Sequence, residues 1–211
     1  MTTPLPLPPP ELSLGEQLQA LIHQIPDDGI SLGRLLDVVG DEGLLLLTAM
    51  MVLVFLVPVS IPGVSTVFGA AILLVGVSRL TGRALWLPQR LRDRTLPGSR
   101  VRAALARGLT WVKRFERISR PHRLRRLAEH RGWLVVGNLA FISAALLLMA
   151  PLSLLPFSNT LPAIALLFYS IGFIQRDGGA VLAGHLAQIA SIVYFGAVLA
   201  GGGAALAALF A

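Results

Sequence analysis

The chain has 211 residues, of which 55% are hydrophobic and only 14% are charged. Globular proteins carry about a quarter of their residues as charged side chains, so this composition excludes an ordinary soluble domain. The absence of cysteine excludes disulfides, thiolate metal sites and cysteine nucleophiles, whereas the net charge of +7 matters mainly through its distribution along the chain.

The chain begins with a proline-rich stretch over residues 1–12 that lacks the basic and apolar regions of a signal peptide. Ser13 to His23 is predicted to form a short helix. Ser31 then caps an amphipathic helix that we expect to lie at the membrane interface. Residues 1–30 are therefore a tail and short helix, and residues 31–200 form one membrane domain.

Three long apolar stretches predict an integral membrane protein. Leu44 to Ser78 and Gly132 to Gln175 lack Asp, Glu, Lys, Arg and His, and Gly178 to Ala211 contains one ionisable side chain, His185. A bilayer accepts about 20 apolar residues per spanning helix. We expect a polytopic, all-α fold that ends in a final span over residues 180–200 and a Gly/Ala-rich tail over residues 201–211.

Prolines and serines interrupt the first two apolar stretches, at Pro58–Ser65 and Pro151–Ser158. The helices on either side of the first break, Leu44–Val57 and Thr66–Gly82, would be about 21 and 25 Å long, short of a hydrocarbon core of about 30 Å. Broken helices or re-entrant hairpins are therefore expected. Such unwound backbone is tolerated at membrane depth where protein or a wet cavity covers it.

A shift of 93 residues aligns the two breaks without a gap. The matched residues are Pro58 with Pro151, Ser60 with Ser153, Ser65 with Ser158 and Arg83 with Arg176. We interpret residues 44–83 and 132–176 as two copies of one hairpin, either inverted or parallel, as in many transporters. The alternative is that any two Pro/Ser kinks can be aligned at some offset.

The loop between the two hairpins is strongly basic. Residues 79–131 hold 16 of the 18 Lys and Arg residues and only three acidic residues. Under the positive-inside rule this pattern predicts that residues 79–131, which include the basic loop over residues 84–131, lie in the cytoplasm and attract anionic lipid headgroups rather than nucleic acid. Residues 100–118 form an amphipathic helix, which lies either on the membrane surface or against the protein's own cytoplasmic face.

Several short motifs resemble the ExoD family of bacterial membrane proteins. They are Pro62-Gly-Val-Ser-Thr-Val-Phe-Gly69, Trp86-Leu-Pro88, Pro156-Phe-Ser-Asn-Thr-Leu-Pro-Ala163 and Gln175-Arg-Asp-Gly178. The resemblance covers roughly residues 30 to 200. It implies a multi-pass inner-membrane protein involved in exopolysaccharide production and in tolerance of alkaline conditions.

The chemistry of the breaks favours anion binding over catalysis. No catalytic constellation, metal-ligand spacing or cofactor motif is evident, so we expect no enzymatic activity, metal or cofactor. Helix N-termini expose N–H groups and a positive dipole end, both of which favour an anion. The candidate substrate residues are Ser60, Ser65, Thr66, Ser153, Ser158, Asn159 and Thr160. The alternative is that these residues only cap helices.

Three arginines follow the second helices of the two hairpins. They are Arg79 and Arg83 in the first hairpin and Arg176 in the second. They act either as a gate that contacts headgroups or as positive-inside anchors. We predict a small transporter or lipid-carrier translocase for an anionic substrate. The alternative is a membrane scaffold that regulates a polysaccharide synthase through the basic loop. Expected partners are membrane lipids and polysaccharide-assembly proteins. The sequence leaves open whether the protein forms a homodimer.

Overall fold

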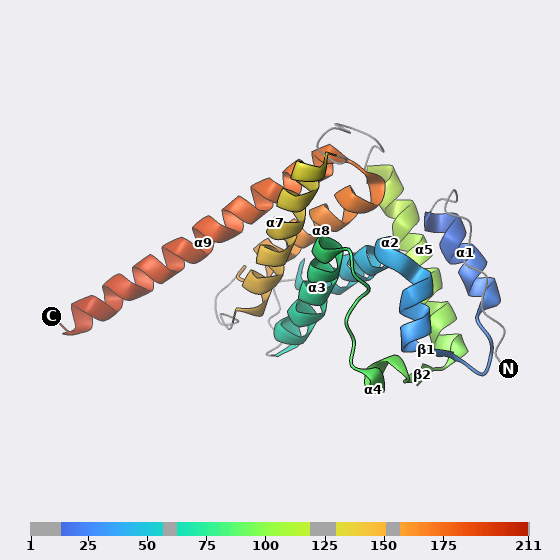
Figure 1. The fold of residues 1–211 in the computed structure, drawn as a ribbon. Helices are drawn as coiled ribbons and strands as arrows, with labels where there is room; N and C mark the ends of the chain where they lie inside the picture. The colour runs from blue at the N-terminus through green and yellow to red at the C-terminus, as the bar shows by residue number, and fades with distance from the viewer. Residues whose placement is uncertain (1–13, 57–62, 119–129, 151–156, 211) are drawn as a thin grey trace.

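The computed structural model describes residues 14–56, 63–118, 130–150 and 157–210, and these residues are almost entirely helical (Figure 1). In chain order the elements are α1 (Leu14–Gln24), β1 (Ile30–Ser31), α2 (Leu32–Val52), the 3₁₀ helix η1 (Leu53–Leu56), α3 (Val64–Thr81), α4 (Gln89–Arg92), β2 (Thr95–Leu96), α5 (Gly98–Ile118), α7 (Arg131–Met149), α8 (Thr160–Gln175) and α9 (Gly178–Phe210). The predicted all-α membrane fold is confirmed.

Within the described residues, four helical segments are long and apolar enough to cross a bilayer. They are Leu32–Leu56, Val64–Thr81, Arg131–Met149 and Gly178–Gly201. The apolar helix α8 has 16 residues, which gives about 24 Å at 1.5 Å per residue. The breaks at 57–62 and 151–156 lie outside the described residues, so the re-entrant arrangement stays a prediction.

Helix α2 consists of two helical parts that meet at a kink. Ser31 caps the first part as expected, because its hydroxyl accepts a hydrogen bond from the backbone N–H of Arg34 at 3.4 Å. The two parts meet at Gly40, whose φ of 63° and ψ of −169° are not helical. Glycine alone adopts such a conformation readily, so Gly40 separates the amphipathic helix from the apolar part of the span, as the sequence predicts.

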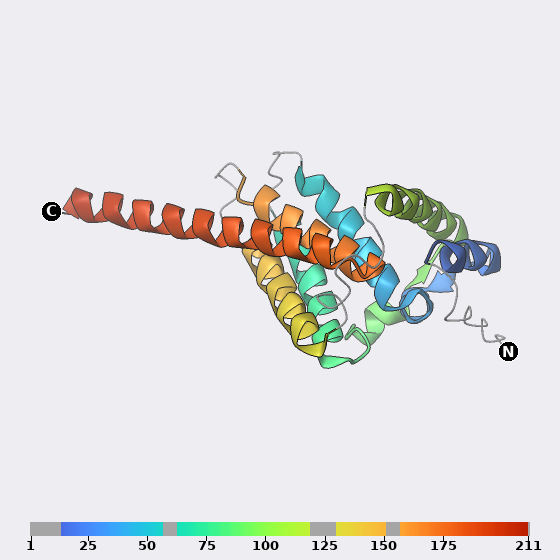
Figure 2. The same cartoon turned by 90° about the horizontal axis from the view of Figure 1, so that it is seen from above.

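The last span differs from the sequence prediction. Helix α9 continues past Ala200 and through Gly201 to Phe210, where a tail had been expected. Each glycine weakens a helix by about 1 kcal/mol relative to alanine. In an apolar environment, however, the backbone groups find no water, so continuing the helix costs less than exposing them. Figures 1 and 2 show α9 extending beyond the other helices.

In the helical bundle, helices from the first predicted repeat pack against helices from the second. Helix α2 packs against α8, and α3 packs against α7, while α8 also lies along α9. Small residues allow the α3–α7 approach: a Cβ on Gly69 would lie 2.4 Å from Cγ of Met149, and one on Gly76 would lie 2.8 Å from Ile142. The buried side chains between these helices include Leu45, Ile72, Phe141, Leu148, Leu166 and Tyr169.

Backbone hydrogen bonds at the ends of α3 and α8 recur in the same positions. They run from Val67 N to Gly63 O and from Leu161 N to Phe157 O at the starts, and from Arg83 N to Ser78 O and from Asp177 N to Gly172 O at the ends. Each of these bonds is displaced by 94 residues from its counterpart, whereas the N-caps Gly63 and Asn159 are displaced by 96. The two helices therefore do not fix one register, and the alignment at 93 residues stays a prediction.

Helices α1 and α5 form a layer beside the bundle, on the side where α2 begins (Figures 1 and 2). On the apolar face of α5, Val112 is buried against residues of α1 and α2, and Val101 is buried against Ile25 and Ile30. Strands β1 and β2 pair Ile30 with Leu96 and so attach the basic loop to the start of α2. Of the two alternatives for α5, the structure favours packing on the protein itself.

Candidate functional site

The first turns of α3 and α8 lie at the same end of the bundle. Gly69, near the start of α3, faces Ala145 and Met149 in the last turns of α7. Helix α8 begins at Thr160, a short stretch of chain after α7 ends. Both helix N-termini therefore lie at the end of the bundle that is remote from Arg79 and the basic loop, where α3 ends.

The predicted substrate residues divide into buried and exposed side chains. Ser65, Ser158 and Asn159 are buried, whereas Thr66 is exposed and Thr160 is partly exposed. A buried polar group must be hydrogen-bonded or it costs free energy. Because Thr66 is exposed, its side chain does not share the buried environment of Ser65. The remaining two candidates, Ser60 and Ser153, lie outside the described residues.

Asn159 is the most unusual residue of this group. It occupies the N-cap position of α8, yet its side chain makes no capping hydrogen bond. The side chain is 7% exposed, and within the described residues neither Oδ1 nor Nδ2 has a hydrogen-bond partner. Helix α3 likewise begins without a side-chain cap, at Gly63. The Asn159 side chain therefore does not cap α8.

The arrangement offers donors suited to an anion. The first N–H groups of an α-helix have no partner within the helix, and the dipole places partial positive charge there. At the start of α8, Asn159 adds a buried amide, which can donate through Nδ2 and accept through Oδ1. In the first turn of α3, Ser65 adds a buried hydroxyl.

The three predicted arginines have different surroundings. The Arg79 side chain is 14% exposed, its Nε donates to Oδ1 of Asn138 at 3.3 Å, and its guanidinium carbon lies 4.9 Å from the centre of the Phe173 ring. It also lies 4.0 Å from a carboxylate oxygen of Asp41. Arg79 therefore connects α2, α3, α7 and α8 within the bundle, and it is more than an interfacial anchor.

Arg83 and Arg176 are exposed residues at helix ends. The backbone N–H of Arg83 bonds to Ser78 O just after α3, and Arg176 ends α8 in the left-handed conformation with φ of 51°. Left-handed residues close helices in this way because their N–H groups satisfy the last carbonyls. The structure does not place these two side chains in the group that surrounds Arg79.

Sequence reasoning missed a second polar group, formed by α7, α8 and α9. The Tyr169 hydroxyl lies 2.8 Å from Nδ1 of His185, and Gln188 donates from Nε2 to Oγ of Ser143 at 2.7 Å. His185 had been singled out, but its partners had not, because residues 16 positions apart meet only once α8 and α9 pack antiparallel. The sequence signal that could have indicated this group is the presence of single polar residues within otherwise apolar helices.

Replacing Arg79 by leucine should lower the free energy of unfolding by about 1–3 kcal/mol, because Asn138 Oδ1 would lose its donor in a buried position. The matched control is Arg83→Leu, at an exposed position where changes of about 0.5 kcal/mol are usual. Equilibrium unfolding in mixed micelles measures both. Equal losses in the two variants would show that the Asn138 contact contributes nothing.

No group of His, Cys, Asp and Glu residues in the described part of the chain is arranged to hold a metal ion. The polar groups described above are amides, hydroxyls, an imidazole, a guanidinium and the Asp41 carboxylate beside that guanidinium. These groups bind or orient a ligand by hydrogen bonding, and the guanidinium adds a positive charge.

Comparison with known proteins gives the family. The model of the family described as "Exopolysaccharide synthesis, ExoD" matches residues 14–197. Protein ExoD of Rhizobium meliloti (strain 1021) is 44% identical over 183 residues, covering 87% of this chain and 76% of that protein. An uncharacterized protein of Synechocystis sp. (strain ATCC 27184 / PCC 6803 / Kazusa) is 34% identical over 122 residues, covering 57% of this chain and 56% of that protein.

No solved structure matches the chain. The family match spans the helical bundle and the α1–α5 layer alike, so both parts are shared with relatives. Together with the four apolar helices, it establishes that the chain is a membrane protein that belongs to the ExoD family, which is involved in exopolysaccharide synthesis.

Proposed function

We infer that the protein is a small transporter or lipid-carrier translocase that binds an anionic substrate at the first turns of α3 and α8. The observation that carries this proposal is Asn159, a buried side chain at a helix N-terminus whose Oδ1 and Nδ2 have no partner in the described part of the chain. A buried amide left unpaired costs about 1–3 kcal/mol, so a function has to offset that cost.

The packing of helices from one predicted repeat against helices from the other supports a transport role. Helices α2 and α8, and likewise α3 and α7, come from different hairpins, so a motion of one hairpin against the other would alter access to both N-termini. We place the basic loop in the cytoplasm of a bacterial inner-membrane protein, because of its 16 basic residues. The anion site then faces the opposite end of the bundle.

Inorganic phosphate is the simplest probe for this site. Ser65→Ala and Ser158→Ala should each weaken phosphate binding to the purified protein about tenfold, since a hydrogen bond to a charged group contributes about 1.5–3 kcal/mol and 1.4 kcal/mol is one decade. Ser143→Ala is the control, because Ser143 is hydrogen-bonded to Ala140 O and Gln188 Nε2. Calorimetric titration measures the affinities.

Uptake of labelled phosphate into proteoliposomes separates the two classes of function. A transporter should accumulate label in wild type and lose the signal in the variants that bind weakly. Binding without uptake would favour the scaffold that regulates a polysaccharide synthase. Wild-type affinity in both serine variants would remove the basis of the anion site.

A further inference from the structure

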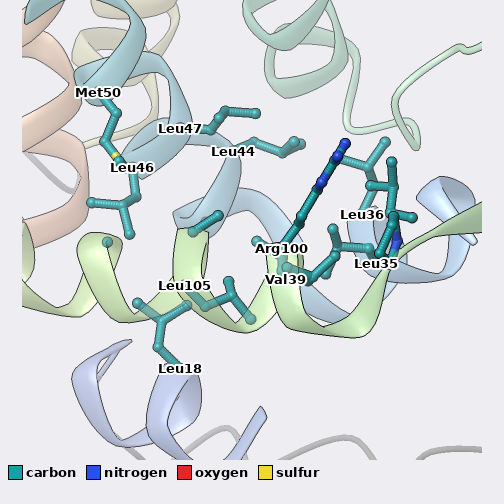
Figure 3. A pocket seen from close by; sticks show the side chains of 16 residues that line it. Leu18, Leu35, Leu36, Val39, Leu44, Leu46, Leu47, Met50, Arg100 and Leu105 are labelled. Atoms are coloured by element: carbon teal, nitrogen blue, oxygen red, sulfur yellow. The ribbon is translucent and has the colours of Figure 1, made fainter. Parts of the chain in front are cut away.

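An apolar cavity of about 280 Å³ lies between α1, α2 and α5 (Figure 3). Its walls are aliphatic side chains from all three helices, including Leu18, Leu36, Leu46, Met50 and Leu105. Ligand pockets generally span about 300–1,000 Å³, so this space suits part of a slender apolar chain rather than a bulky molecule. It shares no residue with the candidate anion site.

Arg100 is the charged residue among the side chains that line the cavity. Figure 3 shows it reaching from α5 toward α2, with its guanidinium beside Leu36. Two neighbouring arginines are neutralised by acids: Arg92 bonds to Asp37 at 2.8 Å, and Arg102 bonds to Asp27. Arg100 has no such partner within the described residues. One uncompensated cation therefore lies at the wall of an apolar space.

The order of residues along the cavity also suits a lipid. Its lining begins at Leu96, Pro97 and Arg100 in the basic loop, and it ends at Leu46 and Met50 inside the first span. A phospholipid has the same sequence of groups, because its anionic phosphate lies in the headgroup region and its hydrocarbon chain extends from there into the bilayer. Basic segments at this level attract anionic lipids.

We propose that this cavity holds one acyl chain of an anionic phospholipid, with the lipid phosphate bound by Arg100. The apolar wall contacts the acyl chain, and the unpaired guanidinium of Arg100 binds the negatively charged phosphate. The lipid would fasten α5 and α1 to the start of α2, because the three helices share the cavity. This assignment does not depend on the anion site at Asn159 or on transport.

The test compares phosphatidylglycerol with phosphatidylcholine, titrated separately onto the full-length protein in detergent and followed by native mass spectrometry. Wild type should prefer phosphatidylglycerol about tenfold or more, and Arg100→Gln should abolish that preference, since a charge-assisted hydrogen bond is lost. Arg100→Lys should restore part of it. Arg107→Gln, an exposed position on the same helix outside the cavity lining, should keep it.

A second pair of variants tests the cavity itself. Ala104→Phe fills the space and should weaken binding of both lipids about tenfold, whereas Ala103→Phe, on the adjacent position outside the lining, should not. Both alanines are exposed, so neither change should unfold the protein. Equal affinity of wild type for the two lipids, equal losses in Arg100→Gln and Arg107→Gln, or undiminished binding by Ala104→Phe would each overturn the proposal.

Discussion

Tyr169→Ala should cause the largest loss of stability of any single substitution considered for this protein. The side chain is fully buried, its ring stacks on Phe173 with centroids 6.1 Å apart, and its hydroxyl bonds to His185. Comparable truncations in soluble cores cost about 3–5 kcal/mol. We expect about 3 kcal/mol, the lower end, because lipid already solvates apolar helix surfaces and the loss comes from packing and hydrogen bonding.

Equilibrium unfolding in mixed micelles measures this loss, with Leu186→Ala as the control. Leu186 lies on α9 beside His185 but is 62% exposed, so its truncation should change stability by about 0.5 kcal/mol or less. Tyr169→Phe should cost about 1–3 kcal/mol, since it keeps the ring and removes only the partner of His185 Nδ1. Equal stability of the Ala and Phe variants would contradict the packing role.

Asn159→Leu should raise the free energy of unfolding by about 1–3 kcal/mol. The leucine has a similar size, and it removes a buried amide whose two polar atoms have no partner in the described residues. If Asn159 were an ordinary N-cap, the same change would instead lower stability by about 1 kcal/mol. The two interpretations therefore predict opposite signs, which equilibrium unfolding without added phosphate distinguishes.

Ser170→Ala provides a matched control for the Asn159 result. Ser170 is also buried in α8, but its hydroxyl donates to Leu166 O at 2.8 Å. Removing a satisfied hydroxyl should leave stability unchanged or slightly reduced, because the carbonyl keeps its helical partner. A gain in Ser170→Ala as large as that in Asn159→Leu would mean that α8 gains from any apolar substitution, and not from relief of an unpaired amide.

The apolar helices were predictable because length and uninterrupted hydrophobicity are local properties. The predicted helix over Thr66–Gly82 differs from α3 by two residues at its start and by one residue at its end. The kink in α2 was less predictable. Gly40 separates the two helical parts, but a single glycine does not show in the sequence which backbone conformation it adopts.

The polar contacts were less predictable, since they depend on which helices pack together. Arg79 meets Asn138, 59 residues later, only because α3 lies on α7. The cavity beside Arg100 likewise requires that α1, α2 and α5 converge.

The most direct test of the anion site is the change in melting temperature that phosphate produces in wild type and in Asn159→Leu. A ligand that binds only the folded state stabilises it by about 2.7 kcal/mol at one hundred times its dissociation constant. Wild type should melt at higher temperature with phosphate. Asn159→Leu should melt higher than wild type without phosphate and should show no further rise with it. An Asn159→Leu protein that melts lower than wild type and keeps the full phosphate-induced rise would contradict the site.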